Sequence, residues 1–230
     1  MATDTIAAIA SAPGRGAVGV IRVSGARVPQ IAESIVGNLP APRIAQWAHF
    51  LGLDGAPLDR GIALYFPAPA SYTGEHVLEL QGHGGVLVLD SLLKRLLELG
   101  CRMARPGEFS ERAFLNGKID IAQAEAIADL IDAGSAEAAR AAVRSMQGEF
   151  SAHINELQAQ ITELRTLVEA AIDFPDEELD FVPGSELGRR TASIFMSFDA
   201  VTAAARQGAL LREGLNVVIA GKPTPENPVC

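Results

Sequence analysis

Val77-Leu78-Glu79-Leu80-Gln81-Gly82-His83-Gly84-Gly85 decides the fold of the first half of the chain. Its apolar residues predict a strand over residues 77–80, and the glycines that follow predict a turn. Beyond the turn, leucines recur at helical spacing at positions 89, 92, 93, 96 and 97, and Gly100 would end that helix. The stretch therefore predicts a strand, a glycine turn and a helix in succession.

Short apolar runs and Gly/Pro turns continue on either side of this unit. Residues 5–10, 19–23 and 60–66 predict strands, and residues 28–36 and 105–117 predict helices. Strands interleaved with helices are typical of an α/β or α+β domain. We assign this mixed α/β domain to residues 1–118.

The pattern becomes entirely helical from Asp120 onward. Asp120 and Gln123 form a capping-box signature for a helix that runs to residue 133. We expect one long helix over residues 136–172, because an apolar stripe continues through it at intervals of three and four: Val143, Met146, Phe150, Ile154, Leu157, Ile161, Leu164, Val168 and Ala171. A helix over residues 185–212 would cover part of that stripe, and further helices would be needed for the rest. The expected fold class is α+β, in which residues 119–213 form the first part of a helical domain.

Composition narrows the class of protein. The 230 residues are 48% hydrophobic, which is enough for a buried core, yet no apolar run approaches the ~20 residues of a membrane span. The start carries Asp4 and lacks the basic region of a secretory signal, so we expect a soluble cytoplasmic protein without a membrane partner. Cys101 and Cys230 form neither a disulfide framework nor a zinc site.

The net charge of −9 is concentrated in the middle of the chain. Residues 119–182 hold 3 Lys or Arg against 14 Asp or Glu, whereas the segments before and after are close to neutral. Such a block repels phosphate backbones, so nucleic acid would bind elsewhere or through another chain. Residues 173–180 within it predict a solvated acidic turn, because their spacing does not fit an EF-hand loop.

Four side chains of the first domain are candidates for a binding site. Glu79 either faces solvent or accepts a planar N–H pair, such as the amino-pyrimidine edge of a pterin. Arg22 alternates with apolar residues and should point away from the core. Lys118 follows a helix-ending glycine and either stabilises that helix end or contacts an anion. His83 is a general base, a ligand or a turn residue, and with no second His or Cys nearby we expect no metal there.

The tail resembles the opening of a nucleotide-binding motif. Leu215-Asn216-Val217-Val218-Ile219-Ala220-Gly221 predicts a buried strand that runs into a glycine turn, as a loop of the G-x-x-x-x-G-K-[ST] type would begin. That motif would require Gly, Lys and Ser or Thr at positions where the chain has Glu226, Asn227 and Pro228. We therefore expect no phosphate cradle in the tail.

Distinctive segments run through the whole chain: Asp4–Ala10 with Pro13–Gly16, Ser71–Glu75, Glu79–Gly85, Ala104–Asn116, Ala122–Asp132, Ala170–Glu178 and Gln207–Gly214. Together they resemble the N-terminal part of the MnmE (TrmE) family of tRNA-modification GTPases. The resemblance covers residues 4–223.

This resemblance implies an N-terminal domain that forms a homodimer and binds a one-carbon donor, 5-formyl- or 5,10-methylene-tetrahydrofolate. It implies a helical domain that carries a G domain, in which GTP hydrolysis depends on Mg²⁺ and K⁺. With a flavoprotein of the MnmG type, such proteins build a carboxymethylaminomethyl-type group on C5 of the wobble uridine (U34) of certain tRNAs. By the same resemblance, Arg22, Glu79 and Lys118 match the folate contacts, and no catalytic residue or metal ligand is expected in this chain.

The chain departs from the family after Pro223. The family continues with Asn-Ala-Gly-Lys-Ser-Ser-Leu-Leu, whereas this chain continues with Thr224 and ends at Cys230. With suitably chosen codons, deletion of one base from the family sequence yields this ending and a stop. We therefore expect residues 214–230 to be the first strand of a truncated G domain and an aberrant tail. On this hypothesis the chain alone keeps folate binding and dimerisation and lacks GTPase activity. The alternative is a dimeric helical scaffold that binds no small molecule.

Overall fold

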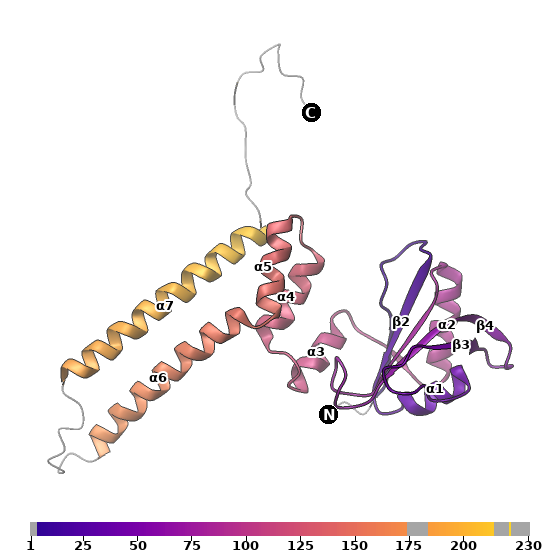
Figure 1. The fold of residues 1–230 in the computed structure, drawn as a ribbon, viewed down its shortest axis with the longest axis horizontal. Helices are drawn as coiled ribbons and strands as arrows, with labels where there is room; N and C mark the ends of the chain where they lie inside the picture. The colour runs from indigo at the N-terminus through magenta and orange to yellow at the C-terminus, as the bar shows by residue number, and fades with distance from the viewer. Residues whose placement is uncertain (1–3, 174–183, 214–220, 222–230) are drawn as a thin grey trace. The chain divides into compact units, whose positions relative to one another are not determined.

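The computed structural model describes residues 4–173, 184–213 and 221, and the chain divides into two compact units, Met1–Ile121 and Ala122–Cys230 (Figure 1). The first unit combines a mixed sheet with helices, and the described part of the second is helical. The predicted α+β class is therefore confirmed. The expected acidic turn from residue 174 to 180 lies outside the described residues, as does the tail from residue 214 apart from Gly221.

A six-stranded sheet forms the centre of the first unit. Its strands follow the order β3-β4-β5-β2-β1-β6, and every neighbouring pair is antiparallel except β1 and β6. The strand bounds are β1 (Ile6–Ile9), β2 (Val18–Ser24), β3 (Gln46–Leu51), β4 (Pro57–Phe66), β5 (Val77–His83) and β6 (Arg102–Met103).

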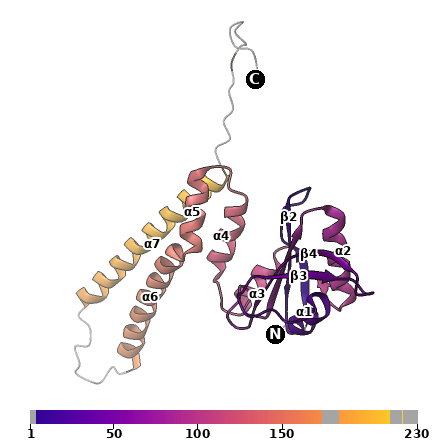
Figure 2. The ribbon, with the colours of Figure 1, turned by 45° about the vertical axis from the view of Figure 1, so that its right-hand side comes forward.

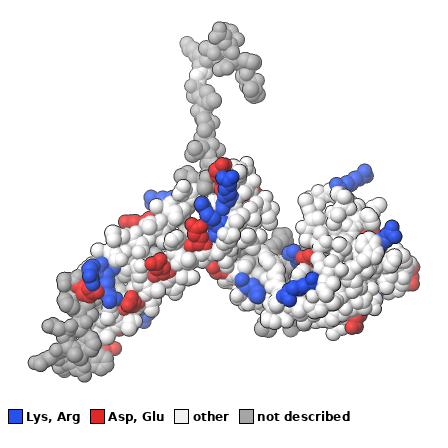
Figure 3. Space-filling model, viewed as in Figure 1, with Lys and Arg blue, Asp and Glu red and all other residues white. Residues whose placement is uncertain are grey.

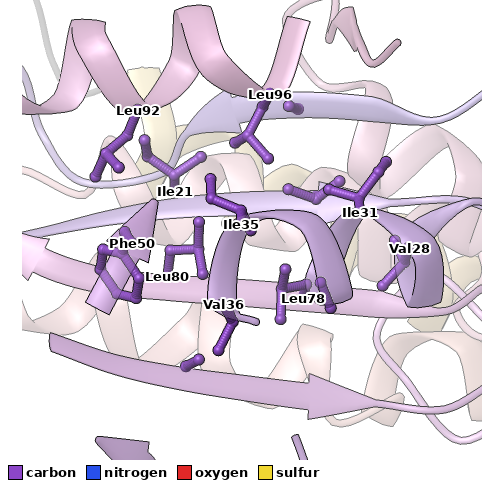
Figure 4. Close-up of a cluster of buried hydrophobic side chains, with 14 of the residues drawn as sticks. Ile21, Val28, Ile31, Ile35, Val36, Phe50, Leu78, Leu80, Leu92 and Leu96 are labelled. Atoms are coloured by element: carbon purple, nitrogen blue, oxygen red, sulfur yellow. The ribbon is translucent and has the colours of Figure 1, made fainter. Parts of the chain in front are cut away.

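Two amphipathic helices, α1 (Val28–Val36) and α2 (Val86–Glu98), supply the apolar side chains that bury one face of this sheet (Figure 4). Leu92 and Leu96 of α2 are fully buried, as the leucine spacing predicts. Alternate residues of β2 and β5 complete the core: Ile21, Val23, Leu78 and Leu80. Because side chains alternate across a strand, the residues between them lie on the opposite face of the sheet.

The strand β3 is absent from the elements that the sequence predicts. Its residues Trp47 and His49 are exposed, and only Ala48 and Phe50 between them reach the core. A strand of this kind at a sheet edge carries one short apolar face, which is a weak periodic signal.

The described helices of the second unit are α4 (Ile121–Ile131), whose first residue is the last of the first unit, α5 (Ala136–Met146), α6 (Glu149–Asp173) and α7 (Gly184–Glu213). The prediction of one continuous helix over residues 136–172 is wrong, because the chain breaks between α5 and α6. At the break, Gly148 has a φ of 87°, and its N–H donates to the carbonyl of Ser145. Glycine adopts such a left-handed conformation without the steric cost that other residues incur.

Helices α6 and α7 lie side by side and antiparallel (Figures 1 and 2). Gln160 of α6 accepts a hydrogen bond from Ser197, and Glu163 pairs with Arg190 one turn farther along α6. Most of the apolar stripe of α6 stays exposed even so, Leu157 being its one buried member in the described part of that helix. Figure 3 shows Asp and Glu side chains spread over this unit, as the acidic block predicts.

Candidate functional site

Arg22 and Glu79 form an ion pair on the sheet face that α1 and α2 leave uncovered. The two residues lie directly opposite each other on β2 and β5. The Nε and one terminal nitrogen of Arg22 lie 2.9 and 2.8 Å from the same carboxylate oxygen, Oε1. From the described residues, the second oxygen, Oε2, receives one long contact, of 3.5 Å from the side-chain amide of Gln81. The pair therefore leaves Oε2 able to accept a hydrogen bond from a ligand.

Two aromatic rings flank the guanidinium of Arg22. Its central carbon lies 5.5 Å from the ring centroid of Tyr72 and 5.9 Å from that of Phe109, within the range of a cation–π contact. The hydroxyl groups of Tyr72 and Ser110 are 2.8 Å apart, so the turn before β5 is tied to helix α3 (Glu108–Leu115). Sequence reasoning missed both rings as site residues. The signal that could have found them is their place inside segments that carry the family resemblance.

A buried arginine holds these elements in place. Arg112 of α3 is 5% exposed, and its terminal nitrogens pair with three carboxylates, those of Asp4, Glu75 and Glu108, at 2.8, 3.1 and 3.2 Å. The three acids belong to the segment before β1, the turn before β5 and α3 itself. Arg112 thus fixes the positions of the two segments that carry Tyr72 and Phe109.

The carboxylates of Asp4 and Glu108 in this cluster are held ionised. A hydrogen bond from Arg102 is the main reason that the pKa of Glu108 falls to about 2, and the backbone N–H of Arg105 and the side chain of Arg112 add to it against the effect of burial. Arg102 likewise lowers the pKa of Asp4, with help from Arg112. The cluster is therefore a network of charged hydrogen bonds at neutral pH.

Lys118 follows the end of α3 and reaches the loop before β5 with its side chain. Its backbone N–H donates to the carbonyl of Ala113 near the end of α3, and its Nζ donates to the carbonyl of Pro69 at 3.2 Å. Asn116 donates to the carbonyl of Thr73 in the same loop. Among the described residues, Arg22 and Glu79 contact each other directly, whereas Lys118 contacts neither of them by a hydrogen bond or ion pair. The structure thus brings two of the three predicted site residues into direct contact and leaves the third on a neighbouring segment.

His83 pairs with Asp59 at the end of β5. Its ring Nδ1 lies 2.7 Å from one carboxylate oxygen of Asp59, and its backbone N–H donates to the other. Burial alone would raise the pKa of Asp59, but these hydrogen bonds hold it below its usual range. In the described ranges 4–173 and 184–213, no group of three His, Cys, Asp or Glu side chains is placed to hold a metal ion.

Apolar side chains surround the ion pair on the same sheet face. Val20 lies two residues before Arg22 on β2 and therefore on the same face. Ile62 and Leu64 of β4 lie opposite Gln81 and Glu79 of β5. Trp47, which pairs with Ile62 across β3 and β4, is 65% exposed. Exposed aromatic side chains are more frequent at protein interfaces than on ordinary surface.

The comparisons with known proteins cover both units. A family profile described as "GTP-binding protein TrmE N-terminus" matches residues 5–118, and one described as "MnmE helical domain" matches residues 121–225. The chain belongs to the MnmE family. The resemblance inferred from the sequence is thereby confirmed.

Two relatives from the MnmE family show how far the similarity extends. Each is described as "tRNA modification GTPase MnmE": one from Thiobacillus denitrificans is 64% identical, and one from Methylococcus capsulatus is 59% identical. Both alignments cover 220 residues, 96% of this chain and 49% of the relative. The chain therefore spans about half the length of these relatives. None of its described helices is long and apolar enough to cross a membrane.

Proposed function

We propose that the first unit binds a reduced folate, 5-formyl- or 5,10-methylene-tetrahydrofolate, around Arg22 and Glu79. The observation that carries the proposal is the carboxylate of Glu79, which is only 15% exposed and keeps Oε2 open beside two aromatic rings. The amino-pyrimidine edge of a pterin presents two parallel N–H donors to such a carboxylate. A flat ring bound there would have Tyr72 or Phe109 to stack on.

The cations of the site suit the other end of the same ligand. A folate ends in a glutamate tail that is anionic at neutral pH. Arg22 and Lys118 place two positive charges beside the loop before β5, and Lys118 is exposed. The three residues thus offer complementary charge to both ends of a folate.

We further propose that the first unit forms a homodimer through the uncovered face of its sheet. Support comes from the apolar side chains that this face exposes, above all Trp47 and Val18 at 65% and 61%. Two copies that pair through this face would remove these side chains from water, which stabilises the dimer by roughly 25 cal/mol per Å² of apolar surface buried.

For the whole protein we propose the activity that the relatives' description gives, tRNA modification coupled to GTP hydrolysis. In this role it would act in the cytoplasm with an MnmG-type flavoprotein on the wobble uridine of tRNA, and the folate would supply the carbon. We assign GTP, Mg²⁺ and K⁺ to a G domain and to no residue described in this structure.

Calorimetric titration with 5-formyl-tetrahydrofolate tests the folate proposal. We expect binding to the 230-residue chain that is weakened about tenfold or more in Arg22→Ala and lost in Glu79→Ala, because each variant removes a contact to the ligand. Glu33→Ala is the matched control, since Glu33 is an exposed carboxylate on α1. An absence of heat at millimolar ligand would overturn the proposal and favour a scaffold that binds no small molecule.

Sedimentation equilibrium tests the dimer. We expect a dimer for the chain and a monomer for Trp47→Glu, because the substitution places a charge in the proposed interface. Leu53→Glu is the control, since Leu53 is an exposed apolar residue in the turn between β3 and β4. Equal masses for the two variants would contradict the assigned face.

A further inference from the structure

The guanidinium of Arg22 has the same donor pattern as the ligand edge that Glu79 is proposed to bind. The amino-pyrimidine part of a pterin contains an N–C(NH₂)–N unit, which is a cyclic guanidine with two parallel N–H donors. Arg22 presents its Nε–H and a terminal N–H in the same fork, and both point at Oε1 of Glu79. Arg22 thus makes to Glu79 the kind of contact that the ligand would make.

The surroundings of the guanidinium also fit a flat heterocycle. Tyr72 and Phe109 hold Arg22 by contacts to its planar group, and aromatic rings stack on a pterin at least as well as on a guanidinium. Neither ring depends on Arg22 for its position. Tyr72 is tied to Ser110, and Arg112 joins the segments that carry the two rings.

Arg22 itself is free to leave this place. Its side chain is 31% exposed, and within the described part of the chain its hydrogen bond and ion pair are both to Glu79. Because the guanidinium is partly open to water, its ion pair with Glu79 is partly screened, so exchange of Arg22 for a ligand would cost little. Once displaced, the guanidinium would be available to pair with an anionic group on the ligand.

We propose that Arg22 occupies the pterin position of the free protein and is displaced from Glu79 when the ligand binds. This inference rests on the proposed folate function. It makes Arg22 a specificity residue with two opposite effects. Arg22 lowers the affinity for any ligand with the guanidine-like edge, because it competes for Glu79. It raises the affinity only for a ligand whose anionic tail can bind the displaced guanidinium. The site would therefore select tailed folates over pterins without a tail.

Affinities for two ligands test the displacement, 5-formyl-tetrahydrofolate and 6-methyltetrahydropterin, which lacks the tail. In Arg22→Ala we expect the folate Kd to rise about tenfold or more, because a charged hydrogen bond to the tail is lost. The Kd of the tail-less pterin should fall about threefold, because the competing ion pair is gone. Arg22→Lys keeps a charge for the tail but lacks the planar fork, so it should tighten the pterin while it retains most of the folate affinity.

Glu79→Gln serves as the second variant and should weaken both ligands, since it removes the carboxylate that both need. Circular dichroism of each variant checks that the fold is retained. If folate binds and Arg22→Ala weakens both ligands or leaves the pterin Kd unchanged, the displacement is overturned while the folate proposal stands. If neither ligand binds the unaltered chain, both are overturned.

Discussion

The two units of this chain use their apolar residues in opposite ways. In the first unit Phe50, Leu80 and Leu92 are completely buried between the sheet and its helices, whereas in the second unit Ile161 and Phe195 are 47% and 64% exposed. The difference teaches that an apolar pattern alone does not make a core. A sheet face and two helices close on each other, but the stripe of a long helix needs partners along its whole length. The candidate site lies in the first unit, whose sheet and helices enclose a buried core.

The largest predicted effect is on the buried ion network of the first unit. Arg112→Leu should destabilise that unit by about 3–5 kcal/mol, because it leaves the carboxylates of Asp4, Glu75 and Glu108 close together without their shared cation. Urea denaturation measures the change. Arg105→Ala, which removes an exposed partner of Glu108, is the control and should cost less than about 1 kcal/mol. Equal losses in the two variants would show that the network is not a buried one.

A pair of truncations sharpens the contrast between the cores. Leu92→Ala should cost about 2–5 kcal/mol, because it leaves a cavity in a packed interior. Ile161→Ala in α6 should cost less than about 1 kcal/mol, since its side chain is already half in water and little burial is lost. Thermal unfolding of both variants checks the difference. A large loss at Ile161 would mean that a partner covers the stripe in solution.

A smaller effect should appear with pH in the first unit. The pKa of Glu108 is about 2 in the folded chain against an ordinary value of 4.5. A lowered pKa contributes stability above the ordinary value and loses it as the pH falls toward the folded value. The free energy of unfolding should therefore decline between pH about 4.5 and about 2. Denaturation at several pH values measures this slope, which Glu108→Gln should reduce, and an unchanged slope in that variant would refute the assignment.

Much of the fold could be predicted because its signals are local. The leucine spacing of α2 and the alternation of β5 depend only on near neighbours in the sequence. The break at Gly148 could not be predicted with the same certainty, because a glycine within an apolar stripe is compatible with a continuous helix at a cost of ~1 kcal/mol. The strand β3 is held in place by its pairing with β4. Local periodicity in the sequence carries no information about that pairing.

The site was less accessible to sequence reasoning, because its geometry depends on pairing across strands. The family resemblance singled out Arg22 and Glu79, but their contact follows from the register of β2 against β5. Two other segments supply Tyr72, Phe109 and Arg112. The ion pairs of Arg112 join these segments, and they are visible only in the folded structure. No spacing in the sequence encodes such a meeting.

Hydrogen–deuterium exchange of the 230-residue chain, with and without 5-formyl-tetrahydrofolate, tests the central claim most directly. The account predicts slow exchange in the strands of the first unit and faster exchange in α6 and α7. Added folate should slow exchange further in β2, in the loop over residues 69–76, in β5 and in α3, and should leave α6 unchanged. Exchange that is unaltered by saturating folate in these segments, or slowed only in the helical unit, would contradict the account.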